Sequence, residues 1–210
     1  MSRNLLKIKQ EAKRYFNHYS HGFDHVIRVY NIASIITKAE GENLDLVGPA
    51  AWLHDIARSI EFQNKNVCHA KKGAVLAKII LLKHHYSSFD CNIICEAIRT
   101  HRYTDDVYPK TKVGQILQDA DRLDLLGAIG IARVFLRAGE KGIPIYDPKV
   151  TIGKKCTSVS TAINHFYEKI LKLKPKTFHT KKAQELATER YKYTKEYIDR
   201  FLYEWKGGNG

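Results

Sequence analysis

Apolar residues in this chain recur at intervals of three and four over long stretches, and this spacing limits the fold more than any other feature of the sequence. One such series runs from Val26 to Ala39 and predicts a helix, for which Gly41 supplies a stop. The same spacing predicts a short helix before residue 15 and longer ones at 67–84, 92–102, 112–126, 128–136, 158–173 and 181–205. No segment alternates apolar with polar residues over the length of a strand. The sequence therefore predicts an all-α protein.

The size of the chain agrees with one folded unit. Its 210 residues, 44% of them hydrophobic, are enough to bury a sizeable core. Loops are expected at 103–111 and 141–155, and Pro175 separates the last two helices, but no linker is long enough to define a second domain. The glycine-rich end at 207–210 is expected to be disordered. We therefore expect a single domain over residues 1–206.

Two polar residues, His54 and Asp55, stand where hydrophobic burial cannot explain them, at the end of the apolar run Ala50–Leu53. Adjacent residues on a helix point about 100° apart, so one metal ion could bind both only at the edge of a helix. Further ligands must then come from other segments. His25 stands at the head of one amphipathic stretch, and Asp121 is flanked by apolar residues in another. Together the four residues form the pattern H…HD…D.

This set of ligands favours a particular chemistry. Two imidazoles and two carboxylates suit a divalent ion such as Mn, Fe, Zn, Co or Mg, and octahedral coordination would leave two positions open. A water in one open position would have its pKa lowered toward neutrality, and a phosphoryl oxygen in the other would be polarised. The four residues therefore predict a catalytic metal centre.

The pattern H…HD…D resembles the HD-domain metal-dependent phosphohydrolases, and the resemblance covers most of the chain. Six segments carry it, in this order: HGFDHVIRVYNIA, AAWLHDIA, HAKKGAVLA, AIRTHRY, LQDADRLDLLGAIGIARVF and NHFYEKILKLK. They are similar to the small stand-alone bacterial branch of that superfamily, which includes nucleotide-type phosphohydrolases. The resemblance implies a helix bundle that holds the metal within residues 20–140, followed by a helical C-terminal extension over residues 156–206.

The resemblance also implies a function. We expect a hydrolase that cleaves a phosphoester or phosphoanhydride bond of a nucleotide by means of metal-activated water. Two alternatives stay open. A catalytically weak HD module could bind a nucleotide or a nucleic acid as a regulator, and a two-metal phosphodiesterase would use His69 and His101 as further ligands.

Acidic and basic side chains close to the expected ligands are candidates for supporting roles. The family's Ala-Asp-x-Leu segment places the ligand at Asp121, and on a helix Asp119 then points away, toward solvent or a capping role. Asp124 lies one turn along the same face and could orient a ligand or the substrate. Arg28 follows His25 by one turn, so it could reach a phosphate or pair with an acid such as Asp124.

Two histidines after the HD pair, His69 and His101, occupy stretches that contribute to the site in related enzymes. In single-metal relatives such histidines contact phosphate or protonate the leaving group. Lys72, three residues after His69, is a further candidate for phosphate binding. The expected catalytic residues are Asp55 and His101, and the expected substrate-binding residues are Arg28, His69, Lys72 and His101.

One position departs from the family's pattern. Some nucleotidase members carry an acidic residue three positions after the HD aspartate, where it can serve as a general acid or base, and this sequence has Arg58 there. That role cannot be carried over. The attacking hydroxide is then expected to be generated mainly by the metal, with help from Asp55 or Asp121. Arg58 itself is expected to contact substrate phosphate or to form a salt bridge with Glu61.

The charge and hydropathy of the chain limit its partners. Its 35 Lys and Arg residues against 22 Asp and Glu give a net charge of +13, which attracts polyanions. The charge is dispersed and no nucleic-acid-binding signature accompanies it, so we expect a phosphorylated small molecule rather than nucleic acid. No run approaches the roughly 18 apolar residues of a membrane helix, and no signal-peptide region is present. We therefore expect a cytoplasmic protein with no membrane partner and with reduced cysteines.

Overall fold

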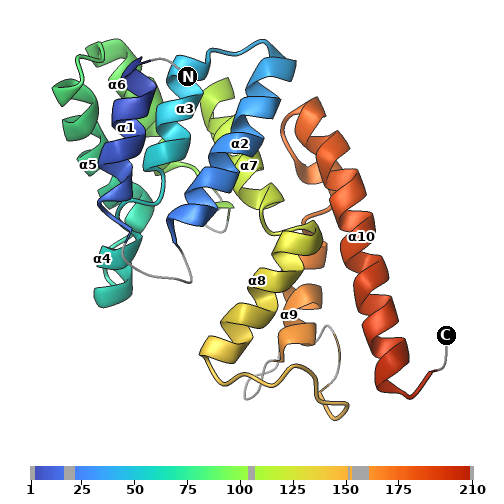
Figure 1. Ribbon diagram of the computed structural model, residues 1–210. Coiled ribbons are helices and arrows are strands. Elements are labelled where there is room, and N and C mark those ends of the chain that lie inside the picture. Colours follow the sequence, from blue (N-terminus) through green and yellow to red (C-terminus); the bar gives the residue numbers. More distant parts are fainter. Residues whose placement is uncertain (1–2, 17–21, 104–106, 151, 153–160, 209–210) are drawn as a thin grey trace. The chain divides into compact units, whose positions relative to one another are not determined.

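A computed structural model describes residues 3–16, 22–103, 107–150, 152 and 161–208 of the protein. All regular structure within these residues is helical, and they contain no strand (Figure 1). The all-α prediction is confirmed. The chain forms two compact units: unit 1 comprises Met1–Arg122 with His179–Ala183, and unit 2 comprises Leu123–Phe178 with Gln184–Gly210. The single-domain organisation expected over residues 1–206 stays a prediction.

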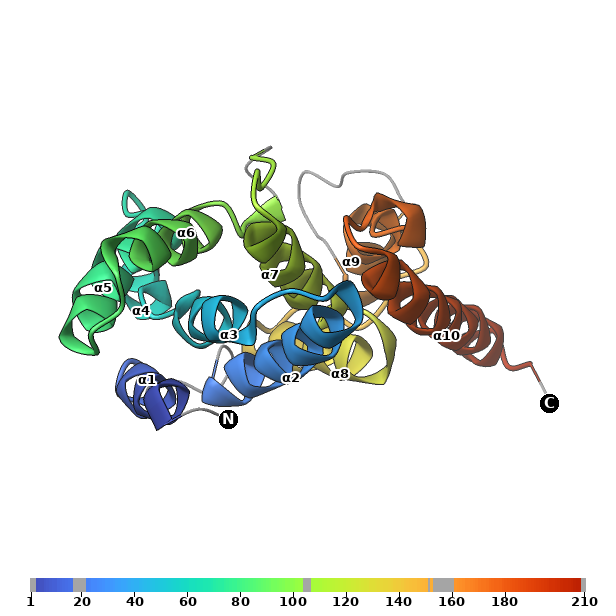
Figure 2. The ribbon, with the colours of Figure 1, turned by 90° about the horizontal axis from the view of Figure 1, so that it is seen from above.

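Unit 1 is built around one apolar helix. Its helices are α1 (Arg3–Lys13), α2 (Phe23–Glu40), α3 (Leu44–Leu53), α4 (Arg58–Gln63), α5 (His69–Lys83), α6 (Ser88–Arg99) and α7 (Lys112–Leu123), which ends at the unit boundary. Figure 2 shows α3 among the others, and it contacts α1, α2, α5 and α6. Every residue from Val47 to Leu53 is buried, as expected of a helix that is apolar on all sides. The end of α3 therefore lies inside the unit.

Start and stop signals set the ends of the helices near this centre. Gly41 ends α2 with a left-handed backbone (φ 68°), the conformation that glycine adopts without steric cost. Asn43 caps α3, because its side chain accepts a hydrogen bond from the backbone N–H of Asp45 (2.9 Å). Ser87 caps α6 in the same way through the N–H of Asp90. These residues set where α2 ends and where α3 and α6 begin.

Unit 2 contains α8 (Gly127–Glu140), α9 (Ala162–Glu168), the 3₁₀ turns η2 (Ile170–Lys172) and η3 (Pro175–Thr177), and the part of α10 (Lys181–Trp205) from Gln184 onward. Its core is aromatic: the ring of Phe135 lies 5.9 Å from that of Phe166 and 6.2 Å from that of Phe201. Some of these side chains line an apolar cavity of about 310 Å³.

Most of the predicted helices are confirmed, and α10 has the predicted bounds. The helix predicted over 158–173 is wrong in its length, because α9 ends at Glu168 and a 3₁₀ turn follows. Farther along the chain, Pro175 disfavours helical backbone at the preceding Lys174, which is extended. The short α4 was not predicted, because none of its residues is buried and no apolar stripe marks it. Residues 158–160, and 209–210 of the expected disordered tail, lie outside the described residues.

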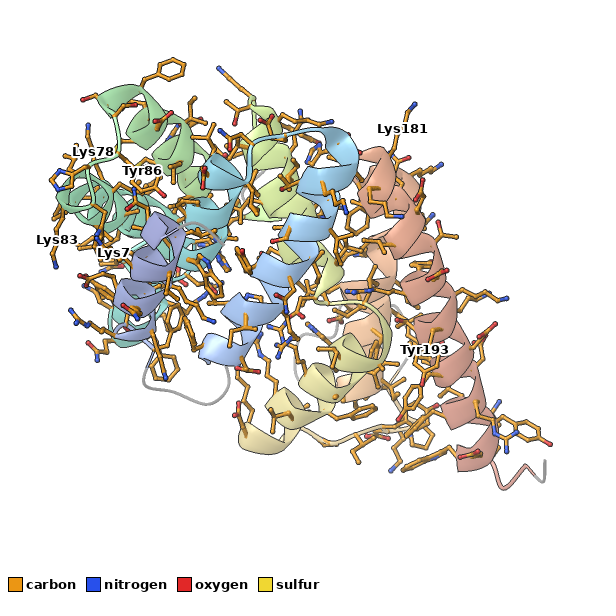
Figure 3. All side chains as sticks on the ribbon, turned by 45° about the horizontal axis from the view of Figure 1, so that its top comes forward. Lys7, Lys78, Lys83, Tyr86, Lys181 and Tyr193 are labelled. Carbon is orange, nitrogen blue, oxygen red and sulfur yellow. The ribbon has the colours of Figure 1, made fainter. Side chains whose placement is uncertain are left out.

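Basic side chains are spread over several helices. Lys7, Lys78 and Lys181, labelled in Figure 3, come from α1, α5 and α10, and all three are exposed. Among the described residues, no helix combines the length and apolar character needed to cross a bilayer.

Candidate metal centre

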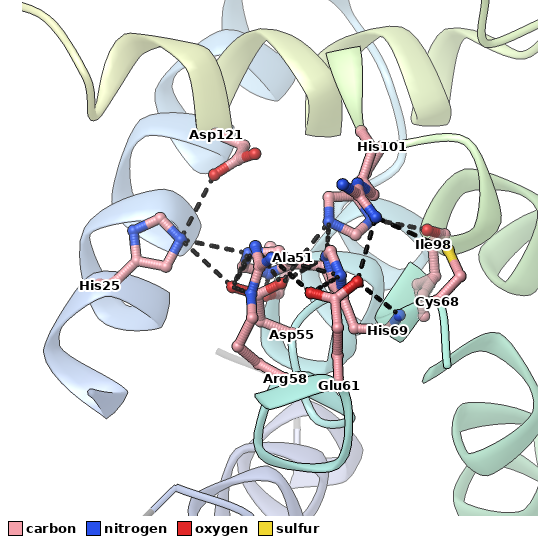
Figure 4. A network of polar contacts seen from close by, with 12 residues as sticks. His25, Ala51, Asp55, Arg58, Glu61, Cys68, His69, Ile98, His101 and Asp121 are labelled. Atoms are coloured by element: carbon pink, nitrogen blue, oxygen red, sulfur yellow. Dashed lines mark hydrogen bonds and ion pairs between the residues drawn. The ribbon is translucent and has the colours of Figure 1, made fainter. Parts of the chain in front are cut away.

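Three helices of unit 1 bring the four predicted ligands to one place, and Figure 4 shows His25, Asp55 and Asp121 of this set. His25 lies in the first turn of α2, on the stripe that buries Val29 and Ile32, and Asp121 lies in the last turn of α7. His54 is the C-cap residue of α3, and Asp55 belongs to the turn that follows. The HD pair therefore leaves the end of a helix, which agrees with the prediction that one ion could engage both only at a helix edge.

The ligand atoms of these residues lie close together. His25 Nε2 is 3.3 Å from Asp121 Oδ1 and 3.3 Å from His54 Nε2. Asp55 Oδ2 is 3.8 Å from His25 Nε2 and 3.7 Å from His54 Nε2. The side chains of His25, His54 and Asp55 are buried, whereas that of Asp121 is 25% exposed. The centre is thus enclosed, with its one partly exposed carboxylate on α7.

A backbone contact fixes the tautomer of His54. Its Nδ1 lies 2.8 Å from the carbonyl oxygen of Ala51, and because a carbonyl only accepts, Nδ1 carries the hydrogen. Burial lowers the pKa of His54 to about 4 and outweighs the opposing charges of Asp55 and Asp121. The ring is therefore neutral at pH 7, and Nε2 presents its lone pair to the other ligands. A hydrogen bond at the second ring nitrogen is the usual support of a metal-binding histidine.

Both carboxylates of the centre are ionised at neutral pH. Burial opposes ionisation of Asp121, but its hydrogen bond with His25 holds its pKa well below the usual range. Burial also opposes ionisation of Asp55, and the guanidinium of Arg58 outweighs it, so the pKa of Asp55 is lowered as well. Two anionic oxygens and neutral imidazole nitrogens are the donors that a divalent cation requires.

Asp55 Oδ1 gives a direct test of whether a cation fits here. This oxygen is buried and accepts no hydrogen bond of good geometry from the described residues, although nitrogens of Arg58 and His69 lie 3.1 and 3.3 Å away. A buried carboxylate oxygen without a hydrogen bond is costly, and a bound cation removes that cost. The residues present therefore fit a divalent metal.

The structure divides the possible ligands into two groups that we name after a helix of each. The α2 group consists of His25, His54 and Asp121, and the α5 group consists of Asp55, His69 and His101. In the α5 group, His69 Nε2 lies 3.3 Å from His101 Nε2 and 3.3 Å from Asp55 Oδ1, and all three side chains are buried. Asp55 connects the groups, because its Oδ2 faces the α2 group and its Oδ1 faces the α5 group.

Both histidines of the α5 group are oriented by an acceptor at Nδ1. His101 Nδ1 donates to the carbonyl oxygen of Ile98 (2.6 Å). His69 Nδ1 lies 2.9 Å from Glu61 Oε2 and donates to it, because burial is outweighed by contacts with His69 and Arg58 and the pKa of Glu61 falls to about 2. In neutral rings both Nε2 atoms therefore carry lone pairs and face each other.

Arg58 lies against Asp55, the carboxylate that connects the two groups, and its Nη2 and Nε donate to Oδ2 (3.2 and 3.3 Å). Its Nη2 is 3.1 Å from Asp55 Oδ1, and its Nη1 is 3.3 Å from Glu61 Oε2. The salt bridge with Glu61 expected from the sequence is therefore present. Glu61 also accepts from Arg102 Nη1 (3.1 Å), a contact that the sequence could not indicate because the two residues are 41 positions apart.

Comparison with known proteins identifies the family. The HD-domain model matches residues 22–126, a segment that contains all four predicted ligands. The chain belongs to the HD-domain family. A relative by sequence, the uncharacterized protein YpgQ of Bacillus subtilis, is 31% identical over 180 residues, which cover 85% of this chain and 81% of that protein.

Solved structures agree with this membership. An HD-superfamily hydrolase from Bacillus thuringiensis has a TM-score of 0.78 at 30% identity and covers 96% of both chains. The crystal structure of Bacillus subtilis YpgQ in complex with ADP has a TM-score of 0.74 at 27% identity, covering 96% of this chain and 94% of that chain. The likeness to both structures extends over nearly the whole chain.

Other residues selected from the HD-domain pattern lie in varied surroundings. Arg28 pairs with Asp24 (Nη1 to Oδ2, 2.6 Å), and its pairing with Asp124, one of the alternatives expected from the sequence, stays a prediction. Asp124 belongs to unit 2, where it pairs with Arg133 (2.6 Å). Lys72 is exposed on α5. Their roles toward a ligand or substrate stay predictions.

Asp119, for which a solvent or capping role was expected, is completely buried. Its carboxylate accepts hydrogen bonds from the backbone N–H groups of His179 (3.0 Å) and Thr180 (2.8 Å), just before α10 begins. The capping alternative is therefore the one that the structure supports, since these N–H groups stand at a helix start.

Proposed function

We propose that this HD-domain protein is a metal-dependent phosphohydrolase that uses activated water to cleave a phosphoester or phosphoanhydride bond of a nucleotide. The observation that carries the proposal is that His25, His54 and Asp121 bring their ligand atoms together and that Asp55 Oδ2 lies within 3.8 Å of both histidines. The likeness to an HD-superfamily hydrolase supports hydrolysis, and the complex of YpgQ with ADP supports a nucleotide as substrate.

The four converging residues are the proposed ligands of a divalent ion, drawn from Mn, Fe, Mg, Zn and Co. Such an ion, when bound, lowers the pKa of water and polarises a phosphoryl oxygen. Asp121 and Asp55 are ionised, so they hold the ion and can accept a proton from the attacking water. Arg58 replaces the acidic residue of some relatives, so Asp55 is the proposed catalytic carboxylate.

His101 is the proposed catalytic residue for the leaving group. Its Nδ1 hydrogen is committed to the Ile98 carbonyl, so the atom that gains or gives a proton is Nε2, which lies 3.6 Å from Asp55 Oδ1. His69 Nε2 faces the same point and is a proposed phosphate contact together with His101. Arg28 and Lys72 are further proposed phosphate contacts, and Asp124 is a proposed orienting residue.

Chelation followed by metal replacement tests the proposal. Protein freed of metal with EDTA should release no phosphate or pyrophosphate from nucleoside mono-, di- and triphosphates, and added Mn should restore release from at least one of them. His54→Ala, which removes a ligand, is the negative control, and the distant His84→Ala is the positive control. If wild-type protein yields no chelator-sensitive product from any nucleotide, the proposal fails and a regulatory HD module becomes the better explanation.

A phosphodiesterase with two metal ions is a second candidate, because Asp55, His69 and His101 form their own possible ligand group. Elemental analysis distinguishes the candidates. One ion per chain supports the proposed mechanism, whereas two ions, one of which depends on His69, would support the second.

A further inference from the structure

Glu61, on the short helix α4, contacts several charged groups of the site, although the proposed mechanism gives it no role (Figure 4). Its Oε2 accepts from His69 Nδ1 (2.9 Å) and from Arg58 Nη1 (3.3 Å). Its Oε1 accepts from Arg102 Nη1 (3.1 Å) and from the backbone N–H of His69 (3.3 Å). One carboxylate thus joins α4, the start of α5 and the segment after α6.

The two arginines held by Glu61 are only partly covered. The side chain of Arg58 is 29% exposed and that of Arg102 is 30% exposed, whereas Glu61 beneath them is 19% exposed. Arg58 also reaches Asp55, the carboxylate shared by the two ligand groups. Two guanidinium groups therefore stand at the edge of the metal centre with part of their surface open to an incoming molecule.

The charges around these arginines make anion binding depend on the metal. Arg58 and Arg102 contribute two positive charges, while Asp55, Glu61 and Asp121 contribute three negative charges, which leaves one net negative charge. A divalent ion changes the sum to one net positive charge. Guanidinium groups bind oxyanions through parallel hydrogen bonds, so a phosphate group gains both charge and geometry here.

We propose that Arg58 and Arg102 form a subsite for a phosphate-type oxyanion of the substrate beside the metal centre, and that Glu61 is the positioning residue that holds them there. This proposal rests on the proposed function for its substrate but names a subsite and a residue that the ligand pattern does not include. Glu61 touches no reacting atom in it. It acts by fixing two guanidinium groups and the Nδ1 hydrogen of His69.

A purely structural role for Glu61 makes a different prediction. Cys68, the N-cap residue of α5, provides no side-chain cap, and Glu61 satisfies the first N–H of that helix instead. If this were its whole contribution, Glu61→Gln would lower stability without a specific effect on anion binding. If Glu61 merely offset the arginine charges, Glu61→Gln would bind phosphate more tightly, because a repelling charge is removed. The positioning role predicts weaker binding.

The experiment measures inorganic phosphate binding by calorimetry to metal-loaded wild-type, Glu61→Gln and Arg102→Gln proteins. Each variant should weaken phosphate binding several-fold, up to about 10-fold, as expected from the loss of a charge-assisted hydrogen bond. Arg99→Gln is the matched control, because Arg99 forms an Arg–Glu pair with Glu96 (2.6 Å) on the exposed side of α6. It should bind phosphate like the wild type. Metal content should be equal in all four proteins.

Three results would overturn the proposal: unchanged or tighter phosphate binding in Glu61→Gln, loss of metal in that variant, or equal effects of Arg99→Gln and Arg102→Gln. Should Glu61→Gln fail to fold, Arg102→Gln still decides, because its side chain is partly exposed. With a nucleotide that the wild type hydrolyses, KM should rise more than kcat falls in both variants. If the wild type hydrolyses none, the proposed function fails while the phosphate titration still tests the subsite.

Discussion

The α2 group and the α5 group have similar donors but different neighbouring charges. Each contains two histidines and one aspartate with ligand atoms close together. In the α5 group the carboxylate of Asp55 already faces a guanidinium, since Arg58 Nη2 lies 3.1 Å from its Oδ1. In the α2 group Asp121 contacts His25 (3.3 Å).

The comparison teaches that ligand geometry alone does not select a metal site. A dication held by the α5 group would share the carboxylate of Asp55 with the guanidinium of Arg58, whereas Asp121 gives the α2 group a carboxylate of its own, so we expect the ion nearer the α2 group.

The largest expected effect separates the two groups by their metal affinity. His54→Ala removes a neutral ligand and should weaken metal binding by about 100-fold, the upper end of what even supporting partners of ligands cost. His69→Ala should change metal affinity by less than about 3-fold while reducing turnover. Metal competition with a chelating dye would give both values, and His84→Ala serves as the control. Equal losses in the two variants would remove the distinction between the groups.

The helical fold and the residues that meet at the candidate metal centre could be predicted largely from local signals. The three-and-four spacing of apolar residues gave α2, and the polar pair after Ala50–Leu53 marked the end of α3. The break after α9 was missed because an apolar pattern does not show where a helix changes to a 3₁₀ turn. Helix α4 was missed because it buries no residue.

The surroundings of the ligands were harder to predict, for a physical reason. Arg58 and Glu61 are three residues apart, so their salt bridge followed from helix geometry. The contact of Glu61 with Arg102 joins residues 41 positions apart and depends on how α4, α5 and α6 pack. Arg28 pairs with Asp24, one turn away on the same helix, an acid that the interpretation of the sequence did not name. Long-range ion pairs are set by packing, which spacing in the sequence does not reveal.

The second-largest expected effect is a change in the free energy of unfolding with pH, and it comes from His54 of the α2 group. Burial lowers the pKa of His54 from 6.5 to about 4 in the folded protein, so between these values the unfolded chain binds more protons. The free energy of unfolding is therefore unaffected by this group above pH 6.5, and it decreases as the pH falls toward 4. In metal-free protein the loss between pH 7 and pH 5 should be about 2 kcal/mol.

Denaturant unfolding of metal-free wild type and His54→Asn at both pH values measures this loss. Burial also lowers the pKa of His165 and His179, so the quantity of interest is the difference between the two proteins. His54→Asn should lose about 2 kcal/mol less than the wild type over this range. Equal losses would mean that His54 is not held neutral, and the lone pair assigned to its Nε2 would lack support.

The smallest expected effect tests from which side phosphate reaches the two groups. Arg28 lies on α2 with His25, its side chain is 26% exposed, and it pairs with the more exposed Asp24. Such a surface pair contributes at most about 1 kcal/mol to stability, so it does not hold the guanidinium firmly.

If the guanidinium turns to the substrate, Arg28→Lys should lower kcat/KM by about 10-fold with metal content unchanged, because lysine cannot form two parallel hydrogen bonds. Asp24→Asn, which breaks the same pair without removing the guanidinium, should keep normal kinetics. Normal kinetics in Arg28→Lys as well would restrict Arg28 to ion pairing within the protein, and phosphate would then be received on the side of Arg58 and Arg102.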